Sequence, residues 1–147
     1  MSYRHVLFAT DFAPDALVAA RKAENIAKKY QARLSVIHVV EYFPLDPSAE
    51  MGIPVQFDME QVLIDTARRH MTELLHKLEM SDVAHWIEIG ATRSEILRVA
   101  EREQVDLIVL GSHGRHGLGL ILGSTANSVL HHAQCDVLAV RLSRDKA

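Results

Sequence analysis

The sequence predicts an α/β layer sandwich built on a mainly parallel sheet, and two observations support that fold class. Five short apolar runs recur along the 147 residues, and most of them are continuous rather than alternating. Continuous runs are typical of strands covered on both faces, as in parallel sheets, although a buried helical segment can show the same pattern. Amphipathic segments lie between the runs, and this alternation favours right-handed crossovers that connect parallel strands.

The five apolar runs are the predicted strands, and they span residues 6–9, 34–40, 83–89, 107–110 and 137–140. In an open parallel sheet, ligands bind beyond the carboxyl ends of the strands, at the point where the strand order reverses. The fold class therefore predicts the place of a binding site before any motif is considered.

Two helices are predicted in the first half of the chain. The first carries apolar residues at spacings of three and four between Ala16 and Ala27, and Pro14 suits its first turn. The second begins after Asp58, with Gln61 three residues on as a capping-box partner, and it is the longest predicted element.

The second half of the chain contributes two more predicted helices. The sequence Thr92-Arg93-Ser94-Glu95 is a further capping box that opens the third helix, and the last helix is expected over residues 124–132. A stretch without clear period, residues 41–57, holds three of the four prolines and exceeds the common connection length. It is either a lid near the site or simply an excursion of the chain.

Length and composition are those of one ordinary globular domain, which we expect residues 1–147 to form. The net charge of −3 argues against a nucleic-acid surface that dominates the molecule. No apolar stretch approaches the ~18 residues of a membrane span, and the N-terminus lacks a signal-peptide pattern. The lone Cys135, expected to be a small buried hydrophobe, fits a reducing compartment, so we expect a cytoplasmic protein without membrane or nucleic-acid partners.

Five of the seven glycines fall between residues 111 and 123, after the fourth predicted strand. Glycines let backbone N–H groups approach an anion closely, and a helix that begins near Ser124 adds unpaired donors and its positive dipole end. Phosphate is the natural ligand, with Ser124 and Thr125 as hydroxyl donors and Arg115 or His116 as positive charge. The alternative is a structural loop whose glycines only make tight turns and let a helix pack closely.

Named nucleotide motifs do not fit this segment. It has no lysine, so it is not a Walker A loop, and the stretch from Gly117 to Gly123 is one residue too long for the dinucleotide fingerprint. His113 and His116 lie three apart, but no cysteine or acidic residue accompanies them, so we predict no protein-ligated metal. A Mg²⁺ ion held mainly by phosphate oxygens fits better, because Mg²⁺ needs few protein ligands.

Four segments, residues 4–12, 34–40, 105–114 and 123–140, resemble the universal stress protein family, and the resemblance covers nearly the whole chain. It implies a flavodoxin-like, Rossmann-like three-layer sandwich with a five-stranded parallel sheet in the order 3-2-1-4-5 and four helices. It also implies a homodimer, often paired through the last strand. Residues 137–140 are apolar and suit a sheet edge that pairs with a second copy, unless the charged tail, residues 141–146, protects that edge.

Nucleotide-binding members of this family carry Gly, two residues, Gly, nine residues, and then Gly followed by Ser or Thr. Gly111, Gly114 and the Gly123-Ser124 pair match, but only eight residues separate Gly114 from Gly123. The extra glycines in the loop could absorb this difference, or it could weaken binding. By resemblance, these residues and Thr125 bind the ribose and phosphates of ATP, with or without Mg²⁺.

Three further binding residues, Thr10, Asp11 and Val39, are assigned by resemblance. Thr10 and Asp11 lie just past the first strand, and Asp11 contacts the adenosine end, where a carboxylate can accept hydrogen bonds from ribose hydroxyls. Its alternative role is a charge that satisfies the dipole of the first helix. The backbone of Val39 reads the adenine edge by resemblance, and its alternative is plain core.

The sequence therefore leads us to expect an ATP-binding, homodimeric stress protein that is not an enzyme beyond slow ATP hydrolysis, since no base for phosphoryl transfer is evident. The alternative is a dimeric interaction protein of the same family that binds no nucleotide. A flavin-dependent carrier is a third class, but only 5% of the residues are aromatic.

Overall fold

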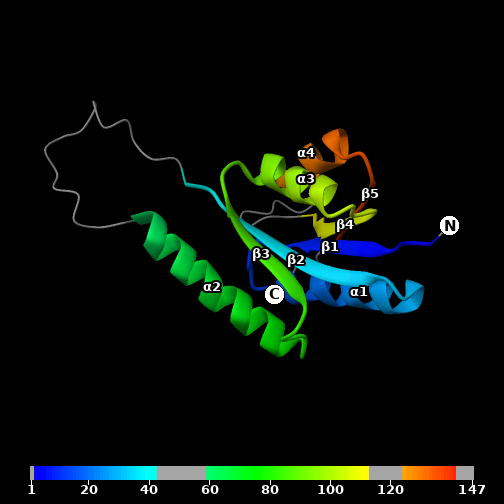
Figure 1. The fold of residues 1–147 in the computed structure, drawn as a ribbon, viewed down its shortest axis with the longest axis horizontal. Helices are drawn as coiled ribbons and strands as arrows, with labels where there is room; N and C mark the ends of the chain where they lie inside the picture. The colour runs from blue at the N-terminus through cyan, green and yellow to red at the C-terminus, as the bar shows by residue number, and fades with distance from the viewer. Residues whose placement is uncertain (1, 43–58, 113–123, 142–147) are drawn as a thin grey trace, which may run out of the picture.

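A computed structural model describes residues 2–42, 59–112 and 124–141 of the chain. Strands and helices alternate along these residues from end to end (Figure 1). In chain order the elements are β1 (His5–Ala9), α1 (Ala16–Tyr30), β2 (Arg33–Val40), α2 (Met59–Lys77), β3 (Ala84–Ile89), α3 (Thr92–Arg102), β4 (Leu107–Gly111), α4 (Ser124–His132) and β5 (Asp136–Val140).

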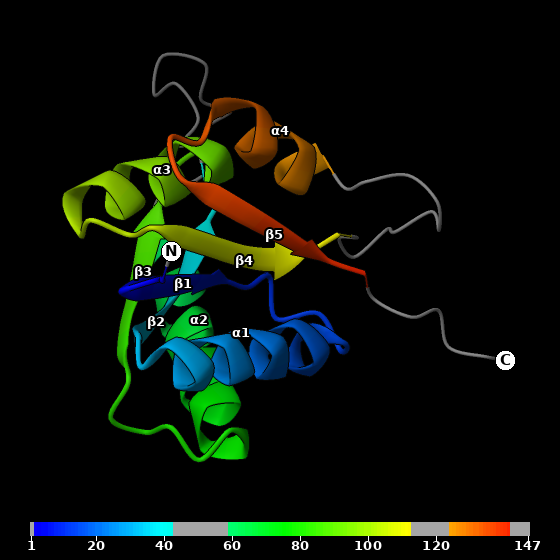
Figure 2. The same ribbon diagram turned by 90° about the vertical axis from the view of Figure 1, so that its right-hand side faces the viewer.

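The described strands form one parallel sheet in the order β3-β2-β1-β4-β5. Helices α1 and α2 lie on one face of the sheet, and α3 and α4 lie on the other (Figure 2). The predicted α/β sandwich, with its strand order and its four helices, is therefore confirmed.

The central strand β1 shows why the apolar runs are continuous. All five of its residues are buried. Val6 and Phe8 pack toward α1 and α2, whereas Leu7 and Ala9 pack toward α3 and α4. A strand covered on both faces favours apolar residues at successive positions, as at residues 6–9 of β1, where only the first strand residue, His5, is polar. The outer strands β3 and β5, which are mostly half-buried or exposed, show the contrast.

The starts of two helices differ from the prediction. Pro14 lies in a turn before α1, whose first residue is Ala16, so the proline precedes the first turn instead of forming part of it. Thr92 is the first residue of α3 rather than its cap. Ala91 occupies the N-cap position, and no side chain caps it.

Gly90 supplies the physical reason for the missing cap. Its φ of +143° is a conformation that favours glycine, and its N–H donates to the carbonyl of Val40 over 3.0 Å. This turn directs the chain so that Ala91 becomes the last extended residue. Glu95 then lies against Gly90, and its carboxylate accepts a bond from Arg98. The capping-box prediction at Thr92 is therefore wrong.

Candidate functional site

The strand order reverses between β1 and β4, and the carboxyl ends of these two strands lie side by side. Ala9 is the register partner of Leu110, so Thr10 and Gly111 are the next residues along the two strands. The N–H of Thr10 donates to the carbonyl of Ile37 in β2 over 3.0 Å. Two predicted site residues, Thr10 and Gly111, thus meet at the edge where open α/β sheets bind ligands, and Asp11 follows Thr10 directly.

The structure describes most of the predicted site residues. Ser124 and Thr125 are the first residues of α4, where the unpaired N–H groups of the helix are found. Gly114, Arg115 and Gly123 lie outside the described residues, as do His113 and His116. The described part of the site therefore consists of Thr10, Asp11, Val39, Gly111, Ser124 and Thr125.

Asp11 is fixed by a local turn. Its Oδ1 accepts a hydrogen bond from the N–H of Ala13 over 2.9 Å, and the N–H of Phe12 donates to Thr10 Oγ1 over 3.0 Å. Among the residues that the structure describes, none bonds to the second carboxylate oxygen of Asp11. That oxygen is available to a hydroxyl donor on a ligand.

The alternative role for Asp11, a charge that stabilises the first helix, does not fit. Helix α1 begins at Ala16, five residues later, and no acidic residue lies in its first turn. Because the effect of the helix dipole is confined to the first turn, Asp11 is too far along the chain to act as that charge.

The side chain and the backbone of Val39 have different roles. Its side chain is buried in the cluster under α3 and α4, as the plain-core interpretation holds. It lies one residue before the end of β2, on the strand that pairs with β1 at this edge. Only the backbone of Val39 is therefore left to contact a ligand.

Ser112 is a polar residue at this edge that the sequence analysis did not single out. Its N–H donates to the carbonyl of Val140 over 2.8 Å, which continues the pairing of β4 with β5. The residue is buried, with 7% exposed, and its Oγ has no hydrogen-bond partner among the described residues. Leaving a buried hydroxyl unpaired costs about 1–3 kcal/mol, so this atom favours a polar ligand.

No sequence signal separates Ser112 from an ordinary loop serine, apart from its place between Gly111 and the following glycines. By alternation along β4, it lies on the sheet face that carries Leu110, Ala126 and α4. This is also the face on which the helix beginning at Ser124 offers its N-terminus.

The described residues contain neither a candidate metal site nor a candidate membrane span. No group of three or more His, Cys, Asp or Glu side chains there is close enough to bind a metal ion. No described helix combines the length and the apolar character that a membrane crossing requires. Cys135 is half-buried rather than buried, and burial, with Asp136 and Asp106 nearby, raises the pKa of its thiol.

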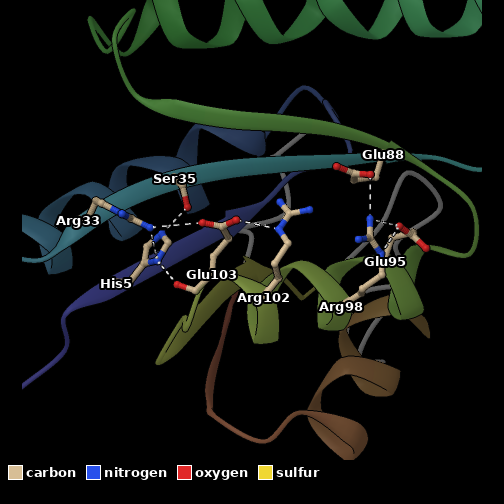
Figure 3. Close-up of polar contacts among 8 residues, drawn as sticks. All are labelled: His5, Arg33, Ser35, Glu88, Glu95, Arg98, Arg102 and Glu103. Carbon is tan, nitrogen blue, oxygen red and sulfur yellow. Dashed lines mark hydrogen bonds and ion pairs between the residues drawn. The ribbon is translucent and has the colours of Figure 1, made fainter.

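A second polar cluster lies at the opposite, amino-terminal edge of the sheet. Figure 3 shows Ser35, Arg33 and Glu103 converging on His5, the first residue of β1. His5 Nε2 is 2.7 Å from Ser35 Oγ, and both side chains are buried. This cluster was not predicted, because a histidine that opens a strand gives no sign of its partners. It supports the fold rather than the site at the carboxyl edge.

Comparison with known proteins identifies the family. The model of the universal stress protein family matches residues 2–141. The chain belongs to the universal stress protein family. Universal stress protein A homolog 1 of Coxiella burnetii is 39% identical to it over 140 residues, which cover 95% of this chain and 97% of that protein.

Solved structures of this family share the fold. Protein MJ0577 of Methanocaldococcus jannaschii superposes with a TM-score of 0.79 and 24% identity, covering 99% of this chain and 100% of that one. A universal stress protein crystallised in complex with cAMP superposes with a TM-score of 0.62 and 24% identity, covering 97% of this chain and 100% of that one. The flavodoxin-like arrangement therefore extends over the whole described chain.

Proposed function

We propose that this universal stress protein binds ATP, with Mg²⁺, beyond the carboxyl ends of β1 and β4. The observation that carries the proposal is the presence, at the carboxyl ends of two neighbouring strands, of Asp11, with an available carboxylate oxygen, and Ser112, with an unpaired buried hydroxyl. The first turn of α4, at Ser124, belongs to the same end of the sheet. The cAMP complex of a protein with this fold lends support, because cAMP is also an adenylate.

Each residue has a part in the proposal. Asp11 accepts from the ribose hydroxyls, and the backbone of Val39 faces the adenine. The hydroxyls and N–H groups of Ser124 and Thr125 bind phosphate oxygens, aided by the positive end of α4. Gly111, Gly114 and Gly123 let the backbone approach the phosphates, and Arg115 adds positive charge; these last assignments rest on the family motif.

The described residues fit an adenylate better than a reaction centre. The carboxylate of Asp11 already accepts from Ala13 and in the proposal faces the ribose. Phosphoryl transfer also needs a group that positions the nucleophile and groups that stabilise the developing charge. We therefore propose a nucleotide-sensitive binding module of the cytoplasm, with slow hydrolysis at most.

Substitution of Asp11 tests the binding site directly. Asp11→Ala removes both the carboxylate and the turn bond to Ala13, whereas Asp11→Asn keeps an oxygen that can accept from Ala13. We expect both variants to bind Mg-ATP roughly 10- to 100-fold more weakly in isothermal titration, because a hydrogen bond to a charged group is lost. Asp82→Asn, an exposed aspartate before β3, is the matched control and keeps the wild-type affinity. If the wild-type protein does not bind Mg-ATP, the proposed function is wrong, and the alternative is a dimeric interaction protein that binds no nucleotide.

We also propose that the protein forms a homodimer through the free edge of β5. Strand β5 is last in the strand order, and residues 137–139 are apolar and half-buried. The carbonyl of Val140 accepts from Ser112 in the β4 direction, so by alternation the N–H of Ala139 points away from β4, toward the free edge. Among the described residues, no strand pairs with this edge, and an edge of this kind is a template for pairing with a second copy.

Ala139→Pro tests this edge. Proline removes the N–H that points outward and leaves the bonds to β4 in place, and edge strands tolerate proline at such positions. We expect the variant to be a folded monomer by light scattering and circular dichroism, and Ala139→Val, which keeps the N–H, to be a dimer. A dimeric Ala139→Pro protein would place the interface elsewhere.

A further inference from the structure

The turn after β1 holds a side chain in a backbone conformation that side chains disfavour. Phe12 has a φ of 60°, in the left-handed region where glycine is usual. It lies directly after Asp11, the residue that the proposed function gives to the ribose. Because this conformation is unfavourable for phenylalanine, contacts from the surrounding structure must stabilise it.

Two histidines from different elements supply such contacts. The ring of Phe12 lies 4.2 Å from the ring of His38 in β2, centroid to centroid, with the planes tilted by 34°. The ring of His70 in α2 meets Phe12 edge-on at 5.4 Å. The aromatic side chain is therefore held between a strand and a helix, and its contact with His70 has the edge-on geometry that aromatic pairs prefer.

His38 also holds the residue on the other side of Asp11. Its Nδ1 is 2.7 Å from the carbonyl oxygen of Thr10, so the ring N–H at this position donates to that carbonyl. The backbone N–H of Thr10 donates to Ile37, the neighbour of His38 in β2. One side chain thus contacts both flanks of Asp11, through the Thr10 carbonyl and the Phe12 ring.

We propose that His38, acting together with Phe12, is a positioning residue that fixes the Asp11 carboxylate for the nucleoside end of the ligand. The inference rests on the proposed function for the role of Asp11, but the contacts themselves do not depend on a ligand. His38 acts through the turn and does not touch the nucleotide. The affinity for the nucleoside then depends on a residue of β2, the strand that pairs with β1.

The test compares two substitutions of His38 in Mg-ATP titrations. His38→Leu removes the donor and the aromatic ring, and we expect about tenfold weaker binding, up to the full loss produced by Asp11→Ala. His38→Asn restores an N–H donor close to the position of Nδ1, and we expect it to recover part of the affinity. The matched control is His85→Leu in β3, whose ring also contacts a backbone carbonyl, that of Val83, over 2.9 Å. It should bind like the wild type.

A double-mutant cycle with Asp11→Ala decides whether His38 acts through Asp11. If it does, His38→Leu causes no further loss of affinity in the Asp11→Ala background, because the group that it positions is gone. Losses that multiply, or a His38→Leu protein that binds as tightly as the wild type, would overturn the inference.

Amide hydrogen exchange separates failure of the inference from failure of the proposed function. The N–H groups of Phe12 and Ala13 are both hydrogen-bonded in the turn, and we expect His38→Leu to speed their exchange selectively, without ligand. If no variant and no wild-type protein binds Mg-ATP, the proposed function fails, and faster exchange at these two amides still supports the positioning role. Unchanged exchange at both would overturn that role whatever the nucleotide does.

Discussion

Replacing Phe8 by alanine is expected to lower the free energy of unfolding by about 3–5 kcal/mol, the usual range for truncating a buried phenylalanine. Phe8 lies in the middle of β1 with only 2% of the residue exposed. It packs in the cluster that joins the sheet to α1 and α2. Alanine removes the ring and leaves a cavity that neighbours on both sides can fill only in part.

The size of this effect can be compared with an exposed residue on the same side of the sheet. Val18 in α1 is 46% exposed, so Val18→Ala should change the free energy of unfolding by less than about 0.5 kcal/mol. Urea titrations followed by circular dichroism measure both. A domain of this size is stable by only about 5–15 kcal/mol, so the Phe8 variant should show a clearly lower midpoint. Equal midpoints for the two variants would mean that β1 is not the centre of the core.

Residues such as Phe8 explain why the fold could be predicted from the sequence. Burial on both faces makes residues 6–9 of β1 and residues 107–110 of β4 continuously apolar, and that pattern is visible without coordinates. The helices between the strands have apolar residues at spacings of three and four, which is also visible in the sequence. The sequence-based prediction is wrong at the start of α3, where Ala91 and not Thr92 is the N-cap residue, after the turn at Gly90. A glycine in the sequence does not show which φ it adopts, so this turn could not be predicted.

The candidate site was only half predictable, for a related reason. Asp11 and Gly111 follow predicted strands, and the fold class brings the ends of those strands together. The contacts that hold the residues on either side of Asp11 were not predictable, because His38 comes from another strand and His70 from a helix far along the chain. A polar residue within a strand pattern does not reveal which neighbour it bonds. Long-range contacts of this kind require the register, which the structure provides.

The same limit applies to His5, whose environment leads to a prediction about pH. Nδ1 of His5 lies 3.1 Å from the carbonyl oxygen of Glu103 and 3.1 Å from a guanidinium nitrogen of Arg33. The carbonyl requires a proton on Nδ1, whereas the guanidinium requires a lone pair there. A neutral ring can satisfy one of these neighbours together with Ser35, in either tautomer.

A protonated ring would satisfy Glu103 and Ser35 but would place a second positive charge beside Arg33. Burial, the largest effect, therefore lowers the pKa of His5 below its ordinary value of 6.5, and Arg33 lowers it further. The Glu103 carbonyl and the negative charges of Glu103 and Asp106 act in the opposite direction without reversing the shift. The folded protein thus prefers the neutral ring.

This shift makes the folded state lose stability in acid. Below about pH 6.5 the unfolded chain takes up a proton at His5 that the folded chain resists, so the unfolded state binds more protons. The contribution of His5 is therefore complete above that pH. It falls as the pH drops from 6.5 toward the folded-state pKa, by at most about 1.4 kcal/mol per pH unit for one proton.

His5→Gln tests this prediction, because a glutamine amide can bond to Ser35 but does not titrate. We expect the free energy of unfolding of the wild type to fall more steeply between pH 7 and pH 5 than that of His5→Gln, in urea titrations at matched ionic strength. His85→Gln, an exposed histidine of β3, should keep the wild-type slope. If the wild type and His5→Gln have parallel profiles, His5 takes up its proton equally in both states, and the buried neutral ring at the start of β1 is not the source of the acid sensitivity.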